Sequence, residues 1–254
     1  MSVTVIMSVY NNQETLARAI KSIQDQTFKN WKLIIVLDGP TDRSEFIARE
    51  FERLDQRIRV IVSPKNQGLA SCLNLAWKAA DTELIARMDA DDMALPQRLE
   101  LQSEFMKVHP EIDILGAAVY IQEPGLTQPK LCVKPATHEE LVAKLYRDTP
   151  FFHPVVMMRR TFLEAVGGYD QAMRYAQDTD LWLRAYLKFR FHNLPTPLLI
   201  YHPPATIKIA KLYWGFRAIF VNALRNGVLF KKGRYAFLFL IGAVWKTLER
   251  QLKS

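Results

Sequence analysis

The first half of the chain alternates between short apolar runs and longer segments in which apolar residues recur every three or four positions. The runs are rich in Val, Ile and Leu, which is typical of strands buried on both faces, whereas the periodic segments indicate helices with one apolar face. Strands and helices that alternate at this spacing predict an α/β fold with a mostly parallel central sheet flanked by helices. The predicted strands are residues 3–9, 31–37, 58–62 and 84–88, and the predicted helices contain residues 16–23, 44–54 and 69–76.

The second half of the chain is less regular. Residues 122–136 contain three prolines and a glycine, which predicts a long loop. Two capping boxes, in which a Thr is followed by a Glu three residues later, predict helix starts at Thr137 and Thr161. The remaining predicted strands are residues 112–121, 155–158 and 198–201, and the remaining predicted helices are residues 96–108, 137–146 and 178–187.

The predicted strand at residues 84–88 runs directly into Asp89, Asp91 and Asp92. Residues that follow a strand of a parallel sheet lie at its carboxyl edge, where open α/β sheets bind their ligands. Three neighbouring carboxylates repel one another, so they need a cation or full hydration. Mg²⁺ or Mn²⁺ with a nucleotide diphosphate would supply that cation, because hard cations take carboxylate oxygens and leave positions for phosphate.

The alternative for this acidic cluster is a solvated turn before the next helix, which Pro96 begins. For Asp92 we expect the role of helix N-cap, and a spare metal ligand is the alternative. Asp38 follows the second predicted strand and therefore lies at the same edge of the sheet as the acidic cluster. It is either a nucleotide contact or an ordinary turn residue.

The positive charge of the chain is concentrated near its C-terminal end. The net charge is +8, and ten Lys and Arg against one Glu give residues 205–254 a charge of +9, so residues 1–204 carry −1. A neutral body argues against a general nucleic-acid-binding protein. Residues 207–229 have a helical pattern of interleaved aromatic and basic residues, and residues 235–245 carry no charge.

That uncharged run is too short for a bilayer span, which takes roughly 20 apolar residues. A basic amphipathic segment of this kind can instead lie on an anionic membrane surface. The alternative is a pair of helices that packs on the body or on a second subunit. The start of the chain lacks a basic segment with a cleavage site, and Cys72 and Cys132 form no metal-binding pattern, so a cytoplasmic protein with free thiols is expected.

Five motifs, in their order along the chain, resemble those of the family 2 glycosyltransferases, and the resemblance extends over about residues 3–203. The fourth resembles the Asp-x-Asp signature of that family, and the fifth resembles its Glu-Asp-x-Asp-Leu-Trp-Leu motif. The motifs are Val5-Ile6-Met7-Ser8-Val9-Tyr10-Asn11, Val36-Leu37-Asp38-Gly39-Pro40-Thr41-Asp42, Asn66-Gln67-Gly68-Leu69-Ala70 with Asn74 and Ala76, Arg87-Met88-Asp89-Ala90-Asp91-Asp92, and Gln177-Asp178-Thr179-Asp180-Leu181-Trp182-Leu183.

The resemblance implies a GT-A fold and an inverting transfer of a sugar from a nucleoside diphosphate donor, with UDP favoured, to an acceptor hydroxyl. It assigns Asp38 to the imide N–H of uracil, Asp89 to the ribose and Asp91 to the metal. The metal would compensate the charge that grows on the leaving diphosphate. Asp178 would be the general base that takes the acceptor proton, and Asp180 is the second choice for that role.

The resemblance also assigns Ser8, Tyr10, Asn66, Arg87 and Ala90 to the nucleotide-sugar site. Two of these assignments have a structural alternative. Arg87 either contacts the diphosphate or pairs with the acidic cluster, and Asn66 is either a ligand or a turn residue.

Three further residues are candidates for the acceptor side of the site or for the core. His153 matches a position where similar enzymes carry a His near the site, so it either completes the metal shell, contacts the acceptor or is structural. Tyr169, which follows two glycines, is a candidate for the acceptor site. Trp182 is expected in the core.

Two departures from the family pattern bear on the site. Leu37 and Pro40 replace the usual Asp and Ser beside Asp38. This difference weakens the assignment of Asp38 to the nucleotide. Gln177 replaces the usual Glu before Asp178. With one neighbouring negative charge fewer, the pKa of Asp178 is expected to be lower than in relatives that carry the Glu.

The expected organisation is a GT-A domain over residues 1–204 and a basic amphipathic helical tail over residues 205–254. Within the domain, residues 1–95 form the nucleotide-binding half and residues 96–204 the acceptor half. The resemblance implies a role in bacterial cell-surface glycan synthesis with a glycan or lipid-linked acceptor. We expect a peripheral protein on the inner face of the cell membrane.

Two other functions are compatible with parts of the pattern. A sugar-1-phosphate nucleotidyltransferase shares a similar sheet and metal, but a Gly-rich loop is expected after its first strand, and residues 9–13 contain no glycine. A non-catalytic membrane-tethering subunit would not need the acidic residues Asp38, Asp89, Asp91 and Asp178, which are all present.

Overall fold

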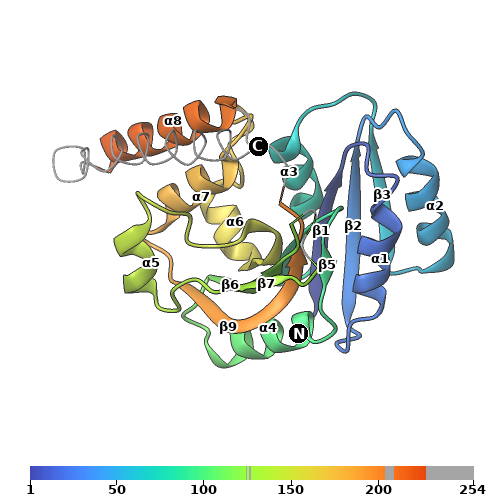
Figure 1. Ribbon diagram of the computed structural model, residues 1–254, viewed down its shortest axis with the longest axis horizontal. Helices are drawn as coiled ribbons and strands as arrows, with labels where there is room; N and C mark the ends of the chain where they lie inside the picture. Colours follow the sequence, from blue (N-terminus) through green and yellow to red (C-terminus); the bar gives the residue numbers. More distant parts are fainter. Residues whose placement is uncertain (124, 126, 204–208, 227–254) are drawn as a thin grey trace.

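The computed structural model of the protein describes all residues except 124, 126, 204–208 and 227–254 (Figure 1). Helices and strands alternate along the chain up to β4, and the later elements follow a less regular order, as the sequence pattern predicts. The elements are β1 (Val3–Val9), α1 (Leu16–Gln24), β2 (Trp31–Asp38), α2 (Ser44–Leu54), β3 (Ile58–Ser63), α3 (Leu69–Ala79), β4 (Leu84–Asp89), β5 (Met93–Ala94), α4 (Arg98–Val108), β6 (Ile114–Ile121), β7 (Lys130–Cys132), α5 (His138–Lys144), the 3-10 helix η1 (His153–Val155), β8 (Met157–Arg159), α6 (Arg160–Val166), α7 (Gln177–Ala185), β9 (Phe191–Tyr201) and α8 (Ile209–Arg225).

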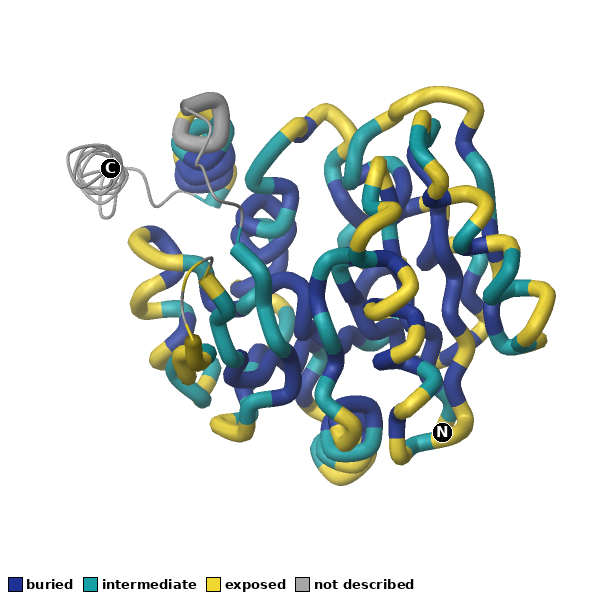
Figure 2. The backbone as a smooth tube through the Cα atoms, turned by 45° about the vertical axis from the view of Figure 1, so that its right-hand side comes forward, coloured by how far each residue is buried: buried dark blue, intermediate teal, exposed yellow. Residues whose placement is uncertain are grey.

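The first four long strands form a parallel sheet in the order β3-β2-β1-β4. Successive residues of β1 enter different hydrophobic clusters: Ile6 packs with α3 on one face, and Val5 and Met7 pack with α1 and α2 on the other. Figure 2 shows these strands as the buried centre of the molecule, with exposed residues on the loops and outer helix faces. Burial on both faces explains why the strands are continuous apolar runs.

The second half extends this sheet with strands of mixed direction. β8 is antiparallel to both β4 and β6, whereas the long strand β9 runs parallel to β6 and antiparallel to β5. β9 curves across the molecule in Figure 1 and pairs with β5, which follows the acidic cluster directly. The parallel arrangement therefore holds for β1 to β4, and strands of mixed direction complete the sheet beyond them.

The two predicted capping boxes have different outcomes. Thr137 caps α5: its hydroxyl accepts the backbone N–H of Glu140, and the Glu140 side chain accepts the backbone N–H of Thr137. The prediction for Thr161 is wrong, because α6 begins one residue earlier and Arg159 occupies the N-cap position without a side-chain hydrogen bond. Strand β8 ends at Arg159 and leads directly into α6, so Thr161 already lies inside the helix.

Helix α8 belongs to the packed body of the protein. Its residues Ala218, Ile219 and Ala223 are buried in the same cluster as α7, and Asn222 donates a hydrogen bond of 3.0 Å to Asp180. Among the described residues, no helix is both long and apolar enough to cross a membrane. The rest of the predicted basic tail, residues 227–254, lies outside the described residues.

Candidate active site

A cavity of about 410 Å³, here called the rim cavity, opens at the carboxyl ends of β1, β2 and β4. The three strands are neighbours in the parallel sheet, so the residues that follow them come together although they are up to 80 positions apart in the sequence. Seven of the residues predicted from the sequence line this cavity: Ser8, Tyr10, Asp38, Asn66, Asp89, Ala90 and Asp91.

A second cavity of about 550 Å³, here called the central cavity, adjoins the rim cavity. Leu69, Asp89 and Tyr201 line both cavities. The central cavity is also lined by three residues that were predicted from the sequence, Arg87, His153 and Asp178. Asp91 and Asp178, which lie 87 positions apart in the sequence, therefore face neighbouring parts of one site.

The acidic cluster is compact enough to bind a cation. Asp89, Asp91 and Asp92 each offer a carboxylate oxygen within 4.8 Å of the others. Burial, and next the charge of Asp89, raise the pKa of Asp91 and raise the pKa of Asp92 to about 8. Without a cation, the carboxyl groups of Asp91 and Asp92 therefore resist ionisation. This donor set fits a hard divalent ion.

The expectation that Asp92 caps a helix is wrong. Helix α4 begins at Arg98 with Gln97 at its N-cap, and Asp92 is fully buried before β5. Its Oδ1 accepts the backbone N–H of His202 at 2.8 Å, and its Oδ2 has no hydrogen-bond partner among the described residues. The hydrogen bond to His202 thus connects the acidic cluster to the residue that follows β9. The second oxygen of Asp92 is available to a ligand.

His202 lines the rim cavity and was not singled out in the sequence. Its Nδ1 lies 3.7 Å from Oδ1 of Asp92 and has no hydrogen-bond partner in the part of the chain that the structure describes. Burial, followed by the charge of Arg18, lowers the pKa of His202 and favours the neutral imidazole that binds metals. A single His after a short apolar strand carries no recognisable sequence signal.

Arg87 pairs with the acidic cluster, which is one of the two roles that the sequence left open. It is 2% exposed, and its Nη2 donates to Oδ1 of Asp89. Its Nε and Nη1 are buried and have no partner among the described residues, although the side chain lines the central cavity. A buried guanidinium with two free donors beside a cavity fits a phosphate or sugar oxygen.

Asp38 holds the loop that precedes α3. Its two carboxylate oxygens accept the backbone N–H groups of Gln67 at 2.6 Å and Gly68 at 2.9 Å. Gly68, at the N-cap of α3, has a φ of 89°, which favours glycine. Because each carboxylate oxygen has a second lone pair, Asp38 can still accept a donor from a ligand in the rim cavity.

The two acidic residues at the start of α7 have different environments. Asp178 is partly exposed and lines the central cavity. Asp180 is buried and accepts hydrogen bonds from Arg184 at 2.8 Å and from Asn222 at 3.0 Å. Because the carboxylate of Asp180 is already bonded to Arg184 and Asn222, Asp178 is the better candidate for the reactive carboxylate. Ala176 directly precedes α7 with a φ of 56°, a left-handed conformation that is unfavourable for a residue with a Cβ.

His153 and Tyr169 form a buried pair next to Arg87. Nε2 of His153 lies 2.9 Å from the hydroxyl of Tyr169. Burial, and next the charge of Arg87, lower the pKa of His153, so its imidazole is neutral. His153 is not part of the acidic group that could hold a metal among the described residues. Tyr169 is 2% exposed, and Trp182 is fully buried, as the sequence predicted for the Trp.

Asn74 connects helix α3 to this pair. Its side-chain amide donates to the carbonyl of Tyr169 at 2.7 Å and accepts the backbone N–H of the same residue at 2.9 Å. Gly168 lies directly against this contact, since a Cβ built there would meet Oδ1 of Asn74 at 2.4 Å. The loop before α7 is thus fixed on α3 by one buried amide.

Gly168→Ala is expected to lower the free energy of unfolding by about 2–5 kcal/mol, from backbone strain of about 1–2 and overpacking of about 1–3. Gly167→Ala is the matched control, because Gly167 has a φ of 73° against 70° for Gly168, but no atom within 4 Å of its built Cβ. The control is expected to lower the free energy of unfolding only by the contribution of backbone strain, about 1–2 kcal/mol. Urea denaturation measures both variants, and equal losses would contradict the proposed role of the Asn74 contact.

The parallel strands β1 to β4, the mixed strands beyond them and the acidic rim have the arrangement of a GT-A fold. The chain belongs to glycosyl transferase family 2, whose model matches residues 4–167. It is 32% identical over 202 residues to the amylovoran biosynthesis glycosyltransferase AmsE of Erwinia amylovora, which covers 77% of this chain and 74% of AmsE. The protein is accordingly a glycosyltransferase, as the sequence motifs implied.

Solved structures share the fold at low sequence identity. The structure of S. aureus TarS in complex with UDP-GlcNAc has a TM-score of 0.71 and 20% identity, and the match covers 88% of this chain and 67% of that one. The mannosyltransferase PcManGT from Pyrobaculum calidifontis, in complex with GDP-Man and Mn²⁺, has a TM-score of 0.65 and 18% identity over 97% of this chain and 75% of that one.

Proposed function

We propose that the protein transfers a sugar from a nucleoside diphosphate donor to an acceptor hydroxyl with inversion at the anomeric carbon. The observation that carries this proposal is the shared wall of the two cavities. Asp89 lines both, so the acidic cluster of the rim cavity and the carboxylate of Asp178 in the central cavity border one continuous site. A donor diphosphate at the acidic cluster then places its sugar within the central cavity.

The donor is proposed to lie along the rim cavity with its base toward Ser8, Tyr10 and Asp38. Asn66 and Ala90 line the same cavity and contribute walls or contacts to the nucleotide. UDP remains the favoured donor nucleotide, because a fixed carboxylate at position 38 can accept the imide N–H of uracil. TarS was solved in complex with UDP-GlcNAc and PcManGT in complex with GDP-Man, which supports a nucleotide-sugar donor in general.

Asp91 is the proposed holder of Mg²⁺ or Mn²⁺, and Asp89 is proposed to contact the ribose. Asp89, the unpartnered oxygen of Asp92 and Nδ1 of His202 lie close enough to be additional metal donors. The metal, when bound, supplies compensation for the negative charge on the diphosphate leaving group. Arg87, whose Nε and Nη1 have no partner among the described residues, is proposed to donate to the same departing oxygens. His153 stays neutral and orients the hydroxyl of Tyr169, while a direct role in the metal shell remains an alternative.

Asp178 is the proposed general base. Its carboxylate accepts the proton of the acceptor hydroxyl while the hydroxyl oxygen forms its bond to the anomeric carbon. The bond from that carbon to the diphosphate breaks on the opposite face of the sugar, which gives inversion.

The proposed acceptor is a cell-surface glycan or a lipid-linked precursor of one. AmsE is named for the biosynthesis of a polysaccharide, amylovoran. By that similarity we extend a role in surface polysaccharide biosynthesis to this protein. We propose residues 1–95 for donor binding and residues 96–204 for the acceptor, because Asp38 and Asp91 line the rim cavity and Asp178 lines the central cavity.

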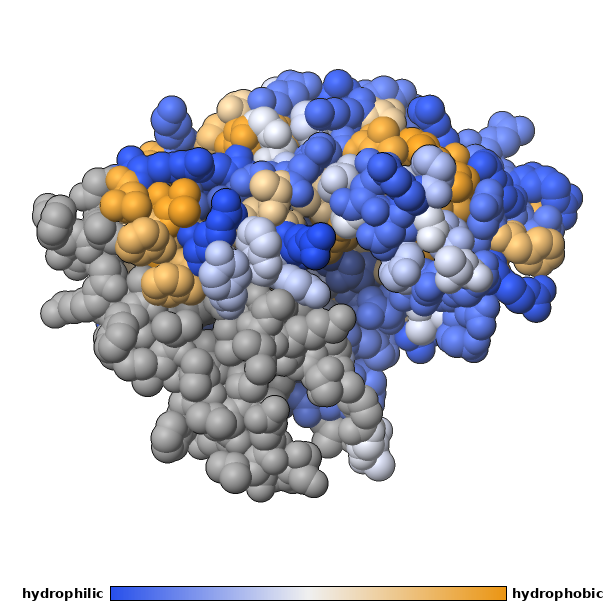
Figure 3. All heavy atoms as spheres, turned by 90° about the horizontal axis from the view of Figure 1, so that it is seen from above, coloured by the Kyte–Doolittle hydropathy of each residue, from blue (hydrophilic) through white to orange (hydrophobic). Residues whose placement is uncertain are grey.

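We further propose a peripheral contact with the cytoplasmic face of the membrane. Helix α8 exposes Tyr213, Phe220 and Leu224, which are 62%, 41% and 50% exposed. Figure 3 shows apolar atoms gathered on this side of the molecule, next to hydrophilic ones. Six Lys and Arg and one Glu follow in residues 227–254. A protein surface that combines exposed apolar side chains with basic ones is suited to bind an anionic membrane.

The variant with Lys231→Gln, Lys232→Gln and Arg234→Gln is expected to bind vesicles of phosphatidylserine and phosphatidylcholine on the order of a hundredfold more weakly, since each base contributes about 1 kcal/mol. Co-sedimentation measures this binding. A triple control with the same loss of charge, Lys21→Gln, Arg53→Gln and Lys107→Gln on the body, is expected to bind as the unaltered protein does. Equal binding of both triple variants would rule out docking through the tail.

A screen of sugar nucleotides for donor hydrolysis, with Mn²⁺ and with EDTA, tests the proposed activity. We expect one nucleoside diphosphate sugar to be hydrolysed to the nucleoside diphosphate and the free sugar, and only with the metal. Formation of a nucleotide sugar from a nucleoside triphosphate and a sugar 1-phosphate would instead indicate a nucleotidyltransferase. No metal-dependent binding of any nucleotide would favour a non-catalytic subunit.

A further inference from the structure

A third cavity of about 550 Å³, here called the outer cavity, lies between the loop before α3 and the loop before α7, with Trp214 of α8 at one side. It adjoins both parts of the active site. Asn66, Gly68 and Leu69 also line the rim cavity, and Leu69, Arg174 and Tyr175 also line the central cavity. None of the residues assigned to the donor, except Asn66, lines the outer cavity.

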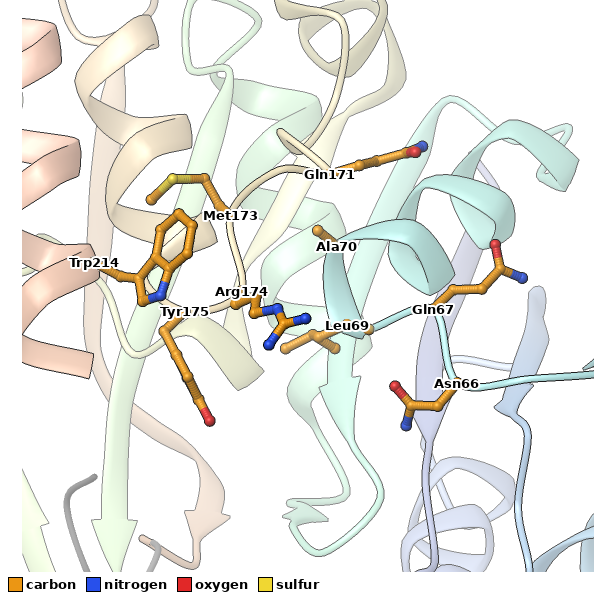
Figure 4. A pocket seen from close by; sticks show the side chains of 10 residues that line it. Asn66, Gln67, Leu69, Ala70, Gln171, Met173, Arg174, Tyr175 and Trp214 are labelled. Atoms are coloured by element: carbon orange, nitrogen blue, oxygen red, sulfur yellow. The ribbon is translucent and has the colours of Figure 1, made fainter. Parts of the chain in front are cut away.

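The outer cavity presents hydrogen-bond donors and no carboxylate. Its ten lining residues include one charged side chain, Arg174, which forms no ion pair or hydrogen bond with any residue that the structure describes. The hydroxyl of Tyr175 and the indole N–H of Trp214 also have no described hydrogen-bond partner. Figure 4 shows the guanidinium of Arg174 between Trp214 and Leu69, with the indole nitrogen turned toward Arg174 and Tyr175.

The aromatic side of this cavity is held in place. Arg217 lies over the ring of Trp214, with its Cζ 5.1 Å from the ring centroid, and its Nη1 donates to the sulfur of Met173 at 3.0 Å. Met173 is buried in the core and also lines the cavity. One face of the indole is thus covered by Arg217, which leaves its edge and its N–H for a ligand. The indole N–H of Trp214 is therefore positioned by contacts within the protein and does not require a ligand to orient it.

We propose that the outer cavity is the acceptor subsite and that it selects an acceptor sugar carrying a negative charge, either a carboxylate or a phosphate. This inference rests on the proposed transferase function. Arg174 would bind the anion, and the N–H of Trp214 and the hydroxyl of Tyr175 would bind sugar oxygens. Asp178 follows Arg174 by four residues and lines the cavity that Arg174 borders, so the reacting hydroxyl of a sugar seated here can reach the base.

The proposal is tested by NMR of the ¹⁵N-labelled indole groups of the full-length protein, with the Trp214 resonance assigned through Trp214→Phe. The probes are methyl glucuronide, glucose 1-phosphate and methyl glucoside, added to protein saturated with UDP and Mn²⁺ and to protein without them. We expect the two charged probes to shift the Trp214 resonance and the neutral glucoside to bind about tenfold more weakly or worse. Comparison of the two charged probes identifies carboxylate or phosphate as the preferred anion.

Arg174→Gln is expected to lower the affinity for the charged probes to that for the neutral one. Arg225→Gln, which removes an exposed arginine of α8 outside the cavity, is expected to leave all three affinities unchanged. Equal affinity for the three probes, or charged probes unaffected by Arg174→Gln, would overturn the inference. If the protein binds UDP but the charged probes do not shift the Trp214 resonance, this inference alone is refuted. If the charged probes shift the Trp214 resonance but the protein does not bind UDP, the proposed function is refuted instead.

Discussion

Asp178→Asn is expected to reduce kcat for sugar transfer by about 10²–10⁴-fold, the range typical of a lost general base. Asparagine has nearly the same shape and can still line the central cavity, but it cannot take the proton of the acceptor hydroxyl. Because Asp178 does not line the rim cavity, the affinity for UDP is expected to change by less than about twofold. Initial rates with saturating donor and acceptor, together with UDP titration, measure both effects.

Asp180→Asn is the comparison that separates chemistry from folding. Its carboxylate is buried and holds Arg184 and Asn222, so this variant is expected to lose stability through a broken buried pair. Folded Asp180→Asn protein is expected to keep most of its transfer rate. If Asp180→Asn lost as much kcat as Asp178→Asn while remaining folded, the base would be Asp180, the second choice from the sequence.

Asp91→Asn is expected to abolish the response of donor hydrolysis and transfer to added Mn²⁺. Loss of activity should exceed about a hundredfold, since even residues behind the direct ligands of a metal account for about 10–100-fold. The same change is expected to leave the unfolding temperature of the metal-free protein unchanged or higher, because burial and Asp89 already penalise the charge of Asp91. A damaged fold would lower that temperature instead.

The control for this prediction is Asp25→Asn, which removes an exposed carboxylate that pairs with Lys21 on α1. It is expected to retain activity and the Mn²⁺ response. An Asp91→Asn protein that is still stimulated by Mn²⁺ would show that the metal does not depend on the second acidic residue of the Asp-x-Asp motif.

The elements that sequence reasoning placed most accurately are those whose burial is uniform. The first predicted strand, residues 3–9, coincides with β1, because both faces of this central strand are covered and every residue is apolar or small. Its parallel neighbours then bring Asp38 and the acidic cluster to one cavity, as their positions after strands predicted. Local pattern and topology point to the same site here.

The elements that were missed have no periodic signal. β5 and β7 are two and three residues long, too short for an alternating pattern. β9 was predicted only from residue 198, because Pro195 and Pro197 disfavour a strand. The structure accommodates Pro197 opposite Ala118, where the register between β6 and β9 shifts. The strand then continues to the histidine that meets the acidic cluster.

The role of Asp92 could not be read from the sequence for a related reason. Its partner His202 lies 110 residues away, and the contact exists only because β5 pairs with β9. Arg174 and Trp214 are brought to one cavity by the packing of α8 on α7, which a helical pattern alone does not orient. The places of Asp92, Arg174 and Trp214 therefore depend on contacts between elements that are far apart in the sequence. Asp38 and Asp89, in contrast, lie at the ends of strands β2 and β4, and both of these strands pair with β1.

The central claim is that a cation at the end of β4 joins the donor diphosphate to the protein. Calorimetric titration of UDP into the unaltered protein, once with Mn²⁺ and once with EDTA, tests it most directly. The acidic cluster repels phosphate without a cation, so we predict binding that is at least about a hundredfold tighter with Mn²⁺ than with EDTA. Equal affinity under the two conditions would contradict the account.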